Sequence, residues 1–535
     1  MSGWLPVAMI AAPLLGALVL LVAPGVVRPV LRVYGMAVSG VTLALAVVMV
    51  ATFDYGQAGR PQFTVDWDWI PGLDLRFQLG VDGVSLPLVA LTALLTFLCF
   101  AYLGWGRGDG AGQLFHPRPG GARARALVFT LLVLEVGMIG TFFALDLLLF
   151  FVFFEIVLVP MYFLIAIWGG EGRRAAAIKF ILYTLLGSVV MLIGLLLIWA
   201  QTGTLDIVAL TEAHGAGMSR GVQVVAFVAV GLGLAVKTPM WPLHTWLPDA
   251  HTEAPTVGSV LLAGVLLKMG TYGFARIAIP VLPEGAVAVA PWLGALGVVG
   301  IIYGALACLA QRDLKRMIAY SSIGHMGFVL LGFATLSTAG INGALFANVA
   351  HGLITGLLFF LVGAIKDRYY TADIPSLGGG MLARLPHLGA VLTFAAIASL
   401  GLPGLAGFWG EMLALFGAFQ PAEVLPIGLF RTFMVIGGLG AVLTAAYFLV
   451  MLSRVTHGTP ATLQVAEASV TGRSTATLPG EHPVDPLPEE PPDIRPYEMV
   501  AWVPLIVLIL LFGLWPKLLL SLTTPAVQTL LGALS

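Results

Sequence analysis

Ionisable residues stand in the middle of several long apolar runs of this sequence, where a charge is costly. The strongest cases are Glu155, Lys237, Lys268, His325, His351 and Glu411. A charge at the centre of a membrane helix costs at least ~2.5–3.5 kcal/mol on insertion scales, so it persists only where it faces protein or water. Burial lowers the pKa of a lysine and raises that of a glutamate, which brings both closer to neutral pH. We therefore predict that these side chains form a path for protons.

Lys237 ends an apolar run that covers only roughly 22 Å of a ~30 Å hydrocarbon core. The span should therefore continue past it into Pro239 and Pro242, which break a helix because proline removes backbone hydrogen bonds. This places the lysine beside unpaired carbonyl groups at mid-membrane depth. If Glu155 lies near Lys237, the lysine stays charged; if the two separate, Lys237 should release its proton toward Lys268. The residue types thus allow a charge-switched relay.

Other interpretations of the same residues stay open. A static ion-pair network would also account for Glu155, Lys237 and Lys268. The two histidines, His325 and His351, could be hydrogen-bonded helix contacts or the axial ligands of a haem. Secondary candidates are Glu135, His244, Asp249 and His251. The first of these is mid-span and fits either function or packing; the other three follow the seventh span, where solvation or proton supply from the cytoplasmic side explains them.

Composition places most of the chain in lipid. It has 535 residues, of which 59% are hydrophobic and only 10% charged, and its mean hydropathy is +0.98. Such a chain has too little polar surface to cover a soluble core. The net charge of −1 and the lack of a basic run argue against nucleic-acid binding. Cys99 and Cys308 are isolated, so we expect no zinc, iron–sulfur or other metal site.

The elements that carry these residues should be membrane helices, because open sheet edges cannot survive in lipid. A helix that crosses the bilayer needs roughly 20 apolar residues. We therefore predict an all-α polytopic membrane protein of fourteen transmembrane helices, the first of which is not a cleaved signal. Their centres lie near Leu15, Ala44, Leu94, Glu135, Phe154, Val189, Gly231, Val265, Val299, His325, Thr355, Leu402, Gly440 and Ile509.

The distribution of lysine and arginine predicts the orientation, since cytoplasmic loops carry the excess. Loops after odd-numbered spans hold Arg28, Arg32, Arg107, Arg118, Arg123, Arg125, Arg173, Arg174, Lys179, Arg312, Lys315, Arg316, Lys366, Arg368 and Arg384. Loops after even-numbered spans hold only Arg60, Arg76, Arg220, Arg276 and Arg431. Both termini are therefore expected outside, in the periplasm of a bacterium.

Two spans are interrupted by proline and glycine, the seventh at 239–242 and the twelfth at 401–407. They lie five spans apart, and a repeat with an odd number of crossings must be inverted in its second copy. The predicted parts are 1–125, with helices 1–3 and an outer-face hairpin at 65–79; 126–280, the first five-helix repeat (helices 4–8); 281–455, the second, inverted repeat (helices 9–13); 456–497, a Pro-rich acidic cytoplasmic loop; and 498–535, helix 14 and the carboxyl end.

The stretch 236–259, Val-Lys-Thr-Pro-Met-Trp-Pro-Leu-His-Thr-Trp-Leu-Pro-Asp-Ala-His-Thr-Glu-Ala-Pro-Thr-Val-Gly-Ser, resembles the signature of antiporter-like subunits of respiratory complex I and of multisubunit cation/proton antiporters. The stretch 313–327 and the span around Glu155 extend the resemblance over nearly the whole chain. It implies a charge-switch pair, a central relay lysine, a central polar axis and an exit-side group. These are, in order, Glu155 with Lys237, Lys268, His325 with His351, and Glu411.

The resemblance also implies partners and a function. Glu411 stands where chains L and N of complex I are expected to have lysine, and the chain ends after its fourteenth span without a lateral helix. We therefore expect chains L and N as flanking partners, beside other complex I membrane subunits and lipids. FMN, iron–sulfur clusters and quinone would belong to partner subunits, so that this chain holds no cofactor. It would couple electron transfer from NADH to quinone with proton pumping in the bacterial inner membrane.

Three alternatives stay open. A subunit of a multisubunit cation/proton antiporter would share the same motifs without redox coupling. A structural membrane scaffold would keep the buried charges only for packing, and neutral replacements would leave transport unharmed. A subunit of a membrane-bound hydrogenase is the third alternative.

Overall fold

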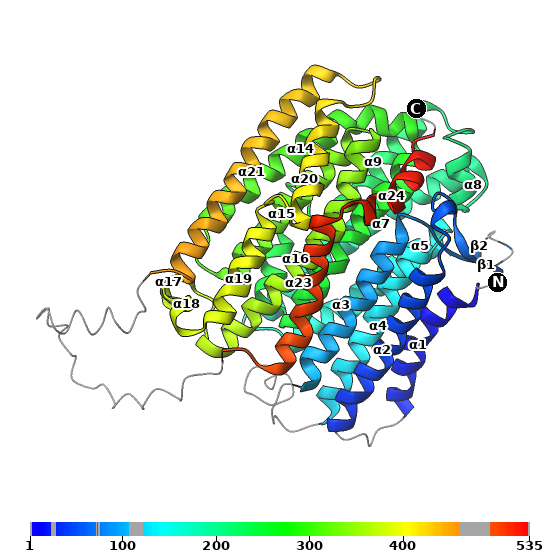
Figure 1. Cartoon of the computed structure of the whole chain (residues 1–535). Coiled ribbons are helices and arrows are strands. Elements are labelled where there is room, and N and C mark those ends of the chain that lie inside the picture. Colours follow the sequence, from blue (N-terminus) through cyan, green and yellow to red (C-terminus); the bar gives the residue numbers. More distant parts are fainter. Residues whose placement is uncertain are drawn as a thin grey trace, which may run out of the picture.

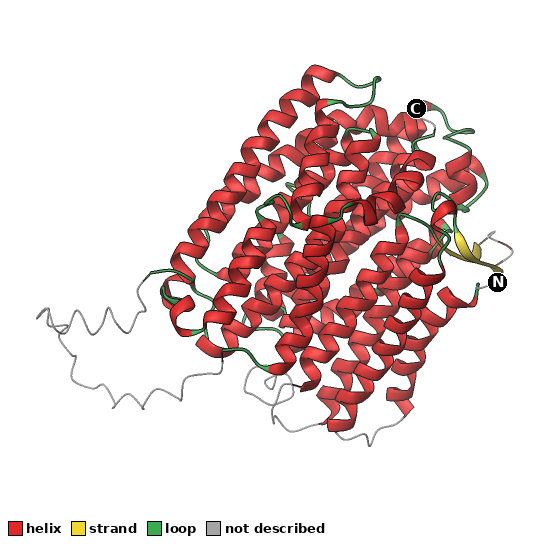
Figure 2. Cartoon of the chain, in the orientation of Figure 1, coloured by secondary structure: helices red, strands yellow, loops and turns green. Residues whose placement is uncertain are grey.

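The computed structural model describes residues 3–22, 28–70, 72, 75–105, 121–458 and 493–532. Most of this described chain is helical, and the helices form one bundle (Figure 1; Figure 2). Thirteen helical stretches of the described chain are long and apolar enough to cross a membrane, two of which, Leu147–Trp168 and Thr256–Val281, are made of several consecutive short elements. The predicted mainly helical, polytopic membrane protein is therefore confirmed.

The α-helices are α1 (Trp4–Val22), α2 (Arg28–Thr52), α3 (Ser85–Trp105), α4 (Gly121–Phe143), α5 (Leu147–Ile156), α6 (Leu158–Trp168), α7 (Arg173–Thr202), α8 (Ile207–Glu212), α9 (Arg220–Lys237), α10 (Trp246–Glu253), α11 (Thr256–Leu261), α12 (Leu267–Gly273), α13 (Ile279–Val281), α14 (Pro283–Leu309), α15 (Leu314–Ala334), α16 (Thr338–Tyr369), α17 (Ile374–Leu377), α18 (Met381–Arg384), α19 (Pro386–Ser399), α20 (Ala406–Phe419), α21 (Ile427–Val455), α23 (Pro496–Leu514) and α24 (Lys517–Leu530). The other elements are the 3₁₀ turn η1 (Tyr55–Gln57), the π-helical turns η4 (Leu262–Leu266) and η5 (Phe274–Ala278), and the strands β1 (Gln62–Ile70) and β2 (Leu75–Val81).

A two-stranded antiparallel hairpin of β1 and β2 lies at one end of the helical bundle (Figure 2). Its register pairs Val65 with Leu79, and the hairpin itself agrees with the alternation in the sequence. Gly3 packs against β1, and Gly83, which follows β2, packs against α24. The beginning and the end of the described chain therefore lie at the hairpin end of the bundle (Figure 1).

Two helices are interrupted where proline and glycine cluster. Helix α9 ends at Lys237, and α10 begins only at Trp246. Helix α19 ends at Ser399 and α20 begins at Ala406; between them Gly404 has a φ of 95°, in the left-handed region that favours glycine. The predicted twelfth span is thus a pair of short apolar helices, which is why it does not count among the thirteen long ones.

Helix α16 runs through the centre of the bundle and is buried along nearly its whole length. A Cβ added to Gly352 of α16 would lie 2.9 Å from the carbonyl oxygen of Gly264 in η4. On another face of α16, Ala347 packs directly against Gly410 of α20. Small residues let helix backbones approach closely. The glycines therefore bring η4 with α12 and the broken helix α20 against one central helix.

Isolated β-bridges join four aspartates in two pairs, Asp146 with Asp206 and Asp313 with Asp373. Each aspartate caps the helix that follows it by accepting hydrogen bonds from that helix's first backbone N–H groups. The first pair lies beside the hairpin, where Gln78 donates to Asp206 over 3.1 Å. The second pair lies at the opposite end of the bundle, beside α17 (Figure 1).

The structure corrects the placement of several basic residues. Arg276 does not lie in a loop: it is buried inside the bundle in η5 and paired with Asp82. Arg174 and Lys179 belong to the first turns of α7, beyond the loop in which they were expected. Of the predicted Pro-rich loop 456–497, residues 459–492 lie outside the described residues.

Candidate functional site

The predicted central lysine and histidine are in direct contact. Lys268 Nζ lies 2.6 Å from His351 Nδ1 and also donates to the carbonyl oxygen of Ala263 in η4. Both side chains are buried, and they come from α12 and from the central helix α16. A π-helical turn changes the local backbone hydrogen-bond pattern, and such turns are frequent at functional sites. An amine and an imidazole at this distance can exchange a proton directly.

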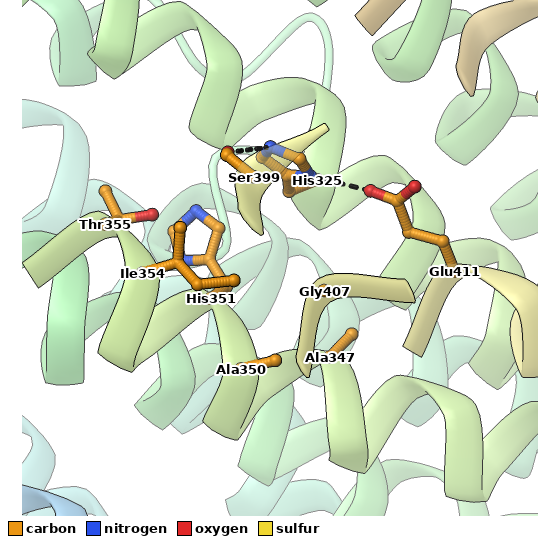
Figure 3. Close-up of a pocket in the computed structure, with 9 residues that line it drawn as sticks. All are labelled: His325, Ala347, Ala350, His351, Ile354, Thr355, Ser399, Gly407 and Glu411. Atoms are coloured by element: carbon orange, nitrogen blue, oxygen red, sulfur yellow. Dashed lines mark hydrogen bonds and ion pairs between the residues drawn. The ribbon is translucent and has the colours of Figure 1, made fainter. Parts of the chain in front are cut away.

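A second contact joins His325, Glu411 and Ser399, from helices α15, α20 and α19. His325 Nδ1 lies 2.9 Å from Glu411 Oε1, and His325 Nε2 lies 3.0 Å from the Ser399 hydroxyl. Figure 3 shows the Glu411 carboxyl group directed at the His325 ring. Both ring nitrogens of His325 therefore have a partner, one of which is a titratable carboxyl group. Helix α20, which begins just after the break, and the end of α19 supply the two partners.

A small cavity connects these two contacts. Its walls include His325, His351 and Glu411, and the two imidazole rings lie 5.6 Å apart between centroids (Figure 3). The cavity has a volume of about 20 Å³, which is room for one water molecule. His351 Nε2 is buried and has no hydrogen-bond partner. A water in this cavity would give that nitrogen a partner and extend the row from Lys268 through to Glu411.

Lys237 and Glu155 lie close together without forming a direct ion pair. Lys237 Nζ donates to the carbonyl oxygen of Phe154 over 2.9 Å and lies 3.7 Å from the centroid of the Phe154 ring. Glu155 follows Phe154 in α5, and its Oε1 is buried without a hydrogen-bond partner. No ion pair within 4.0 Å links the two charged groups among the described residues. This is the separated arrangement of the predicted charge-switch pair.

The structure does not join Lys237 directly to Lys268: no hydrogen bond connects them in the described part of the chain. Helices α9 and α12 meet through Gly270, where an added Cβ would lie 2.5 Å from the Thr238 hydroxyl. One residue further, Thr271 donates to Asn348 over 3.0 Å. Transfer between the two lysines therefore requires water or side-chain motion along this small, partly polar contact.

Glu135 stands apart from both groups. It is fully buried in α4, and neither carboxyl oxygen has a hydrogen-bond partner. An ionised carboxylate in such a place is very costly, so the neutral acid is the favoured form. None of its described contacts is a hydrogen bond or ion pair to another predicted path residue.

Two of the three candidates after α9 line the end of the bundle opposite the hairpin. Asp249 accepts from Lys179 over 2.7 Å and from Arg316 over 3.4 Å, so it forms a half-exposed charge cluster. His244 packs its ring against Tyr303. Burial lowers the pKa of His244 to about 4, and the positive charge of Lys179 adds to this effect. His244 is therefore neutral near pH 7.

His251, the third of these candidates, is buried in α10 with its ring stacked on Phe359 at 4.5 Å between centroids. Neither ring nitrogen has a hydrogen-bond partner. Burial first, and then the positive charges of Lys315 and Lys268, hold the pKa of His251 well below its usual range. His251 is thus a neutral imidazole that feels the positive charges of two buried lysines, of which Lys315 lies nearer the end opposite the hairpin.

Two buried ion pairs were missed by the sequence analysis. Arg276 Nη2 lies 2.6 Å from Asp82 Oδ1, and Arg276 Nε donates to the Tyr272 hydroxyl. Arg368 makes two hydrogen bonds of 2.7 and 2.8 Å to the carboxylate of Glu498. The partners are far apart in the sequence, and each residue stands near the end of an apolar run, where exposure to water is the simpler interpretation. Spacing alone therefore gave no signal for either pair.

Replacing Arg276 by alanine should destabilise the protein by about 3–5 kcal/mol, because the buried carboxylate of Asp82 would lose its charge partner. The effect is measured by heating the purified assembly and monitoring the loss of this chain from it. The Asp82→Asn change made together with Arg276→Ala should recover part of the loss, since no charge is then left unpaired. Arg60→Ala is the matched control on an exposed arginine. A stability equal to wild type in Arg276→Ala would contradict the account of this pair.

The described residues contain no group of three or more His, Cys, Asp or Glu side chains that could hold a metal ion. The cavity between His325 and His351 is far too small for a haem. The two histidines instead contact a lysine and a carboxyl group, which are proton-exchanging partners.

Comparison with known proteins agrees with this architecture. Residues 144–437 match the family model described as NADH:quinone oxidoreductase/Mrp antiporter, transmembrane. The chain is 40% identical over 500 residues to NADH-quinone oxidoreductase subunit M of Rhodobacter capsulatus, covering 92% of this chain and 88% of that one. A chain of respiratory complex I from Thermus thermophilus with bound NADH superposes with a TM-score of 0.82 at 26% identity, covering 99% of this chain and 100% of that one. A chain of the Mrp complex from Dietzia sp. DQ12-45-1b shares the fold, with a TM-score of 0.79 at 22% identity and 99% of each chain covered.

Fold and relatives together define the class as polytopic helical membrane proteins of the antiporter-like type. Within that class, the chain belongs to the NADH:quinone oxidoreductase/Mrp antiporter transmembrane family. The resemblance that the stretch 236–259 indicates is therefore confirmed.

Proposed function

We propose that this chain works in bacterial NADH:quinone oxidoreductase as the proton-translocating membrane chain that its relatives call subunit M. Support comes from the 40% identity to such a subunit and from the similarity to a chain of complex I. The observation that carries the proposal is the buried row from Lys268 through His351 and the cavity to His325 and Glu411. Every member of this row can accept and release a proton.

In the proposed path the six residues act one after another. Glu155 acts on the charge of Lys237 across the Phe154 carbonyl, so a small movement of α5 against α9 switches how firmly Lys237 holds its proton. Lys237 releases its proton toward Lys268, which passes it to His351. The remaining steps run through the cavity water to the second histidine and then to the exit-side carboxyl group, His325 and Glu411.

His251 supplies Lys268 from the cytoplasmic side in this proposal. It is neutral, has two unpartnered nitrogens and is close enough to Lys268 and Lys315 for both charges to act on it. A neutral imidazole can accept a proton on one nitrogen and release one from the other. Glu135, His244 and Asp249 have secondary roles: the first as a neutral buried acid, the others at the cytoplasmic mouth.

The two interrupted helices belong to two inverted repeats of five helices, 126–280 and 281–455. Supporting this is the pair of β-bridges, Asp146 with Asp206 and Asp313 with Asp373, which have the same spacing and follow the same capping pattern. One pair stands at the hairpin end and the other at the opposite end, as inversion requires. Counting α19 and α20 as one broken span gives fourteen crossings. The flanking parts are then 1–125 and 498–535, with the loop 456–497 before the last helix.

The hairpin end and both termini face the periplasm of a bacterial inner membrane. The support is the excess of lysine and arginine at the opposite end, which persists when the buried Arg276 and Arg368 are both left out of the count. Cysteine labelling with a membrane-impermeant maleimide on intact cells tests this orientation. Arg220→Cys, exposed at the start of α9, should react, and Arg174→Cys, exposed at the start of α7, should not. Cys99 and Cys308 are buried and give little background; the reverse labelling pattern would contradict the orientation.

Redox chemistry belongs to other subunits in this proposal. FMN, iron–sulfur clusters and quinone lie in partner chains, and the antiporter-like chains L and N flank this one in the membrane. The redox energy reaches Lys237 through the neighbouring membrane subunits, which move helix α5 and with it Glu155.

Deletion of this chain separates the two candidate functions of the family. If it works in NADH:quinone oxidoreductase, inverted membrane vesicles from the deletion strain lose NADH-driven proton uptake, while growth at high sodium stays normal. If it works in a cation/proton antiporter, which the fold shared with the Mrp complex favours, growth becomes sodium-sensitive and NADH-driven uptake persists. The second result would overturn the proposal.

A further inference from the structure

The break between α19 and α20 decides where the Glu411 carboxyl group lies. Gly401, in this break, has a φ of 81°, and a Cβ added there would lie 3.0 Å from Glu411 Oε2. Gly407, at the start of α20, packs against the carbonyl oxygen of Ala398 in α19. Any shift of the break therefore moves Glu411 relative to its partner His325, which is 2.9 Å away.

The C-terminal end of α23 stands directly on this break. A Cβ added to Gly513 would overlap the carbonyl oxygen of Gly404 and the backbone of Leu405. Next to this contact, the Trp409 indole Nε1 donates to the carbonyl oxygen of Gly513 over 2.7 Å. The backbone of α23 at Gly513 is thus in direct contact with the backbone of the break, and the Trp409 hydrogen bond joins α20 to α23.

The other end of α23 is fixed to the central helix. Glu498, in its first turn, holds Arg368 of α16 with two hydrogen bonds, and both side chains are fully buried. Arg368 also donates to the carbonyl oxygen of Asp493, just before α23. Figure 1 shows α23 running alongside α16. Helix α23 therefore connects two parts of the site. One end is fixed to α16, which carries His351, and the other end packs against the break that positions Glu411.

We propose that Gly513 and Trp409 are positioning residues for proton transfer: together they hold the α19–α20 break so that Glu411 stays within hydrogen-bond reach of His325. The inference rests on the proposed function and assigns a role in it to a helix outside both repeats. Gly513 acts through the backbone of the break, and Trp409 acts through α20, the helix that also carries Glu411.

The test is NADH-driven proton uptake by membrane vesicles that carry the assembled complex with Gly513→Ala. The added methyl group must push α23 away from the break, so uptake should fall about tenfold or more, within the roughly 10²-fold loss that a 1 Å misplacement can cause. Gly438→Ala on α21, where no heavy atom lies within 4 Å of an added Cβ, is the matched control and should keep wild-type uptake. Trp409→Phe, which loses the indole N–H together with the volume of the second ring, should lower uptake about threefold.

A double-mutant cycle separates positioning from general damage. In the background of Glu411→Gln, Gly513→Ala and Trp409→Phe should cause no further loss, because both act through Glu411. The same fold loss in that background, or full uptake in both single variants, would overturn the positioning role. Full uptake in Glu411→Gln alone would instead contradict the proposed path itself, so the two failures are distinguishable. If the complex with Gly513→Ala does not assemble, the double-mutant cycle is measured with Trp409→Phe alone.

Discussion

Replacing Lys268 by alanine should lower NADH-driven proton uptake by about tenfold or more in a complex that still assembles, the range expected when a proton-transfer group is lost. Lys268 is the fully buried start of the row and the hydrogen-bond partner of His351. Without its amine, no proton reaches that imidazole from the side of Lys237. Uptake measured by a pH-sensitive dye in inverted vesicles, alongside NADH oxidation, gives the result.

An arginine at the same position separates relay from fixed charge. Arginine keeps the positive charge but does not release its proton in proteins. Lys268→Arg should therefore be as defective as Lys268→Ala if Lys268 passes protons on. Lys517→Ala, which removes an exposed lysine at the start of α24, is the control and should pump normally. Uptake restored by Lys268→Arg would show that only a static charge is needed, which supports the ion-pair interpretation.

Glu411→Gln should also lower proton uptake by about tenfold. Glutamine keeps the size of the side chain and an oxygen that can accept a hydrogen bond from His325, but it cannot take up a proton. The row would then end at His325, with no titratable group beyond it. Uptake and NADH oxidation in assembled complex measure the effect.

Two further variants make the Glu411 result specific. Glu411→Asp keeps a titratable carboxyl group on a shorter side chain, so it should retain part of the uptake. Glu423→Gln removes an exposed carboxyl group after α20 and should have no effect. Equal loss in Glu411→Asp and Glu411→Gln would point to packing at the break, and wild-type uptake in Glu411→Gln would remove this residue from the path.

The fold was largely predictable from the sequence because lipid imposes a simple rule. Apolar runs of about 20 residues must be helices, and prolines and glycines mark the two interruptions that the structure contains at 238–245 and 400–405. The hairpin was predictable from the alternation of its residues and from the Pro-Gly pair at positions 71–72 of the sequence. Helix ends were less predictable, because basic residues such as Arg174 continue a helix past the apolar run.

The site was predictable in its residues but not in its contacts. A mid-span lysine such as Lys268 is expensive and therefore visible in the sequence. Its contact with His351 depends on the close packing of Gly264 against Gly352. That packing is a feature of the three-dimensional structure, and no local sequence pattern predicts it. The π-helical turns beside Lys268 have no residue signature either, since their residues are ordinary helix formers.

Buried ion pairs near the ends of apolar runs are the part that sequence reasoning misjudged. Arg276 and Arg368 both looked like loop residues, because a charge close to a predicted helix end is usually solvated. Their partners, Asp82 and Glu498, are distant in sequence, so the pairing depends on how the helices pack. This matters for predicting the orientation in the membrane. Buried arginines such as Arg276 and Arg368 must be left out when the basic residues on the two sides are counted.

The central claim is that the buried charges of this chain carry the protons driven by NADH oxidation, and the separated pair Glu155 and Lys237 tests it most directly. The measurement is the rate of NADH-driven proton uptake together with the rate of NADH oxidation in inverted vesicles with Lys237→Ala or Glu155→Gln, with assembly of the complex confirmed. We expect proton uptake and NADH oxidation both to fall sharply in each variant, because the switch that starts the relay is lost. Wild-type uptake and oxidation in both variants would contradict the relay and favour a structural role for this chain.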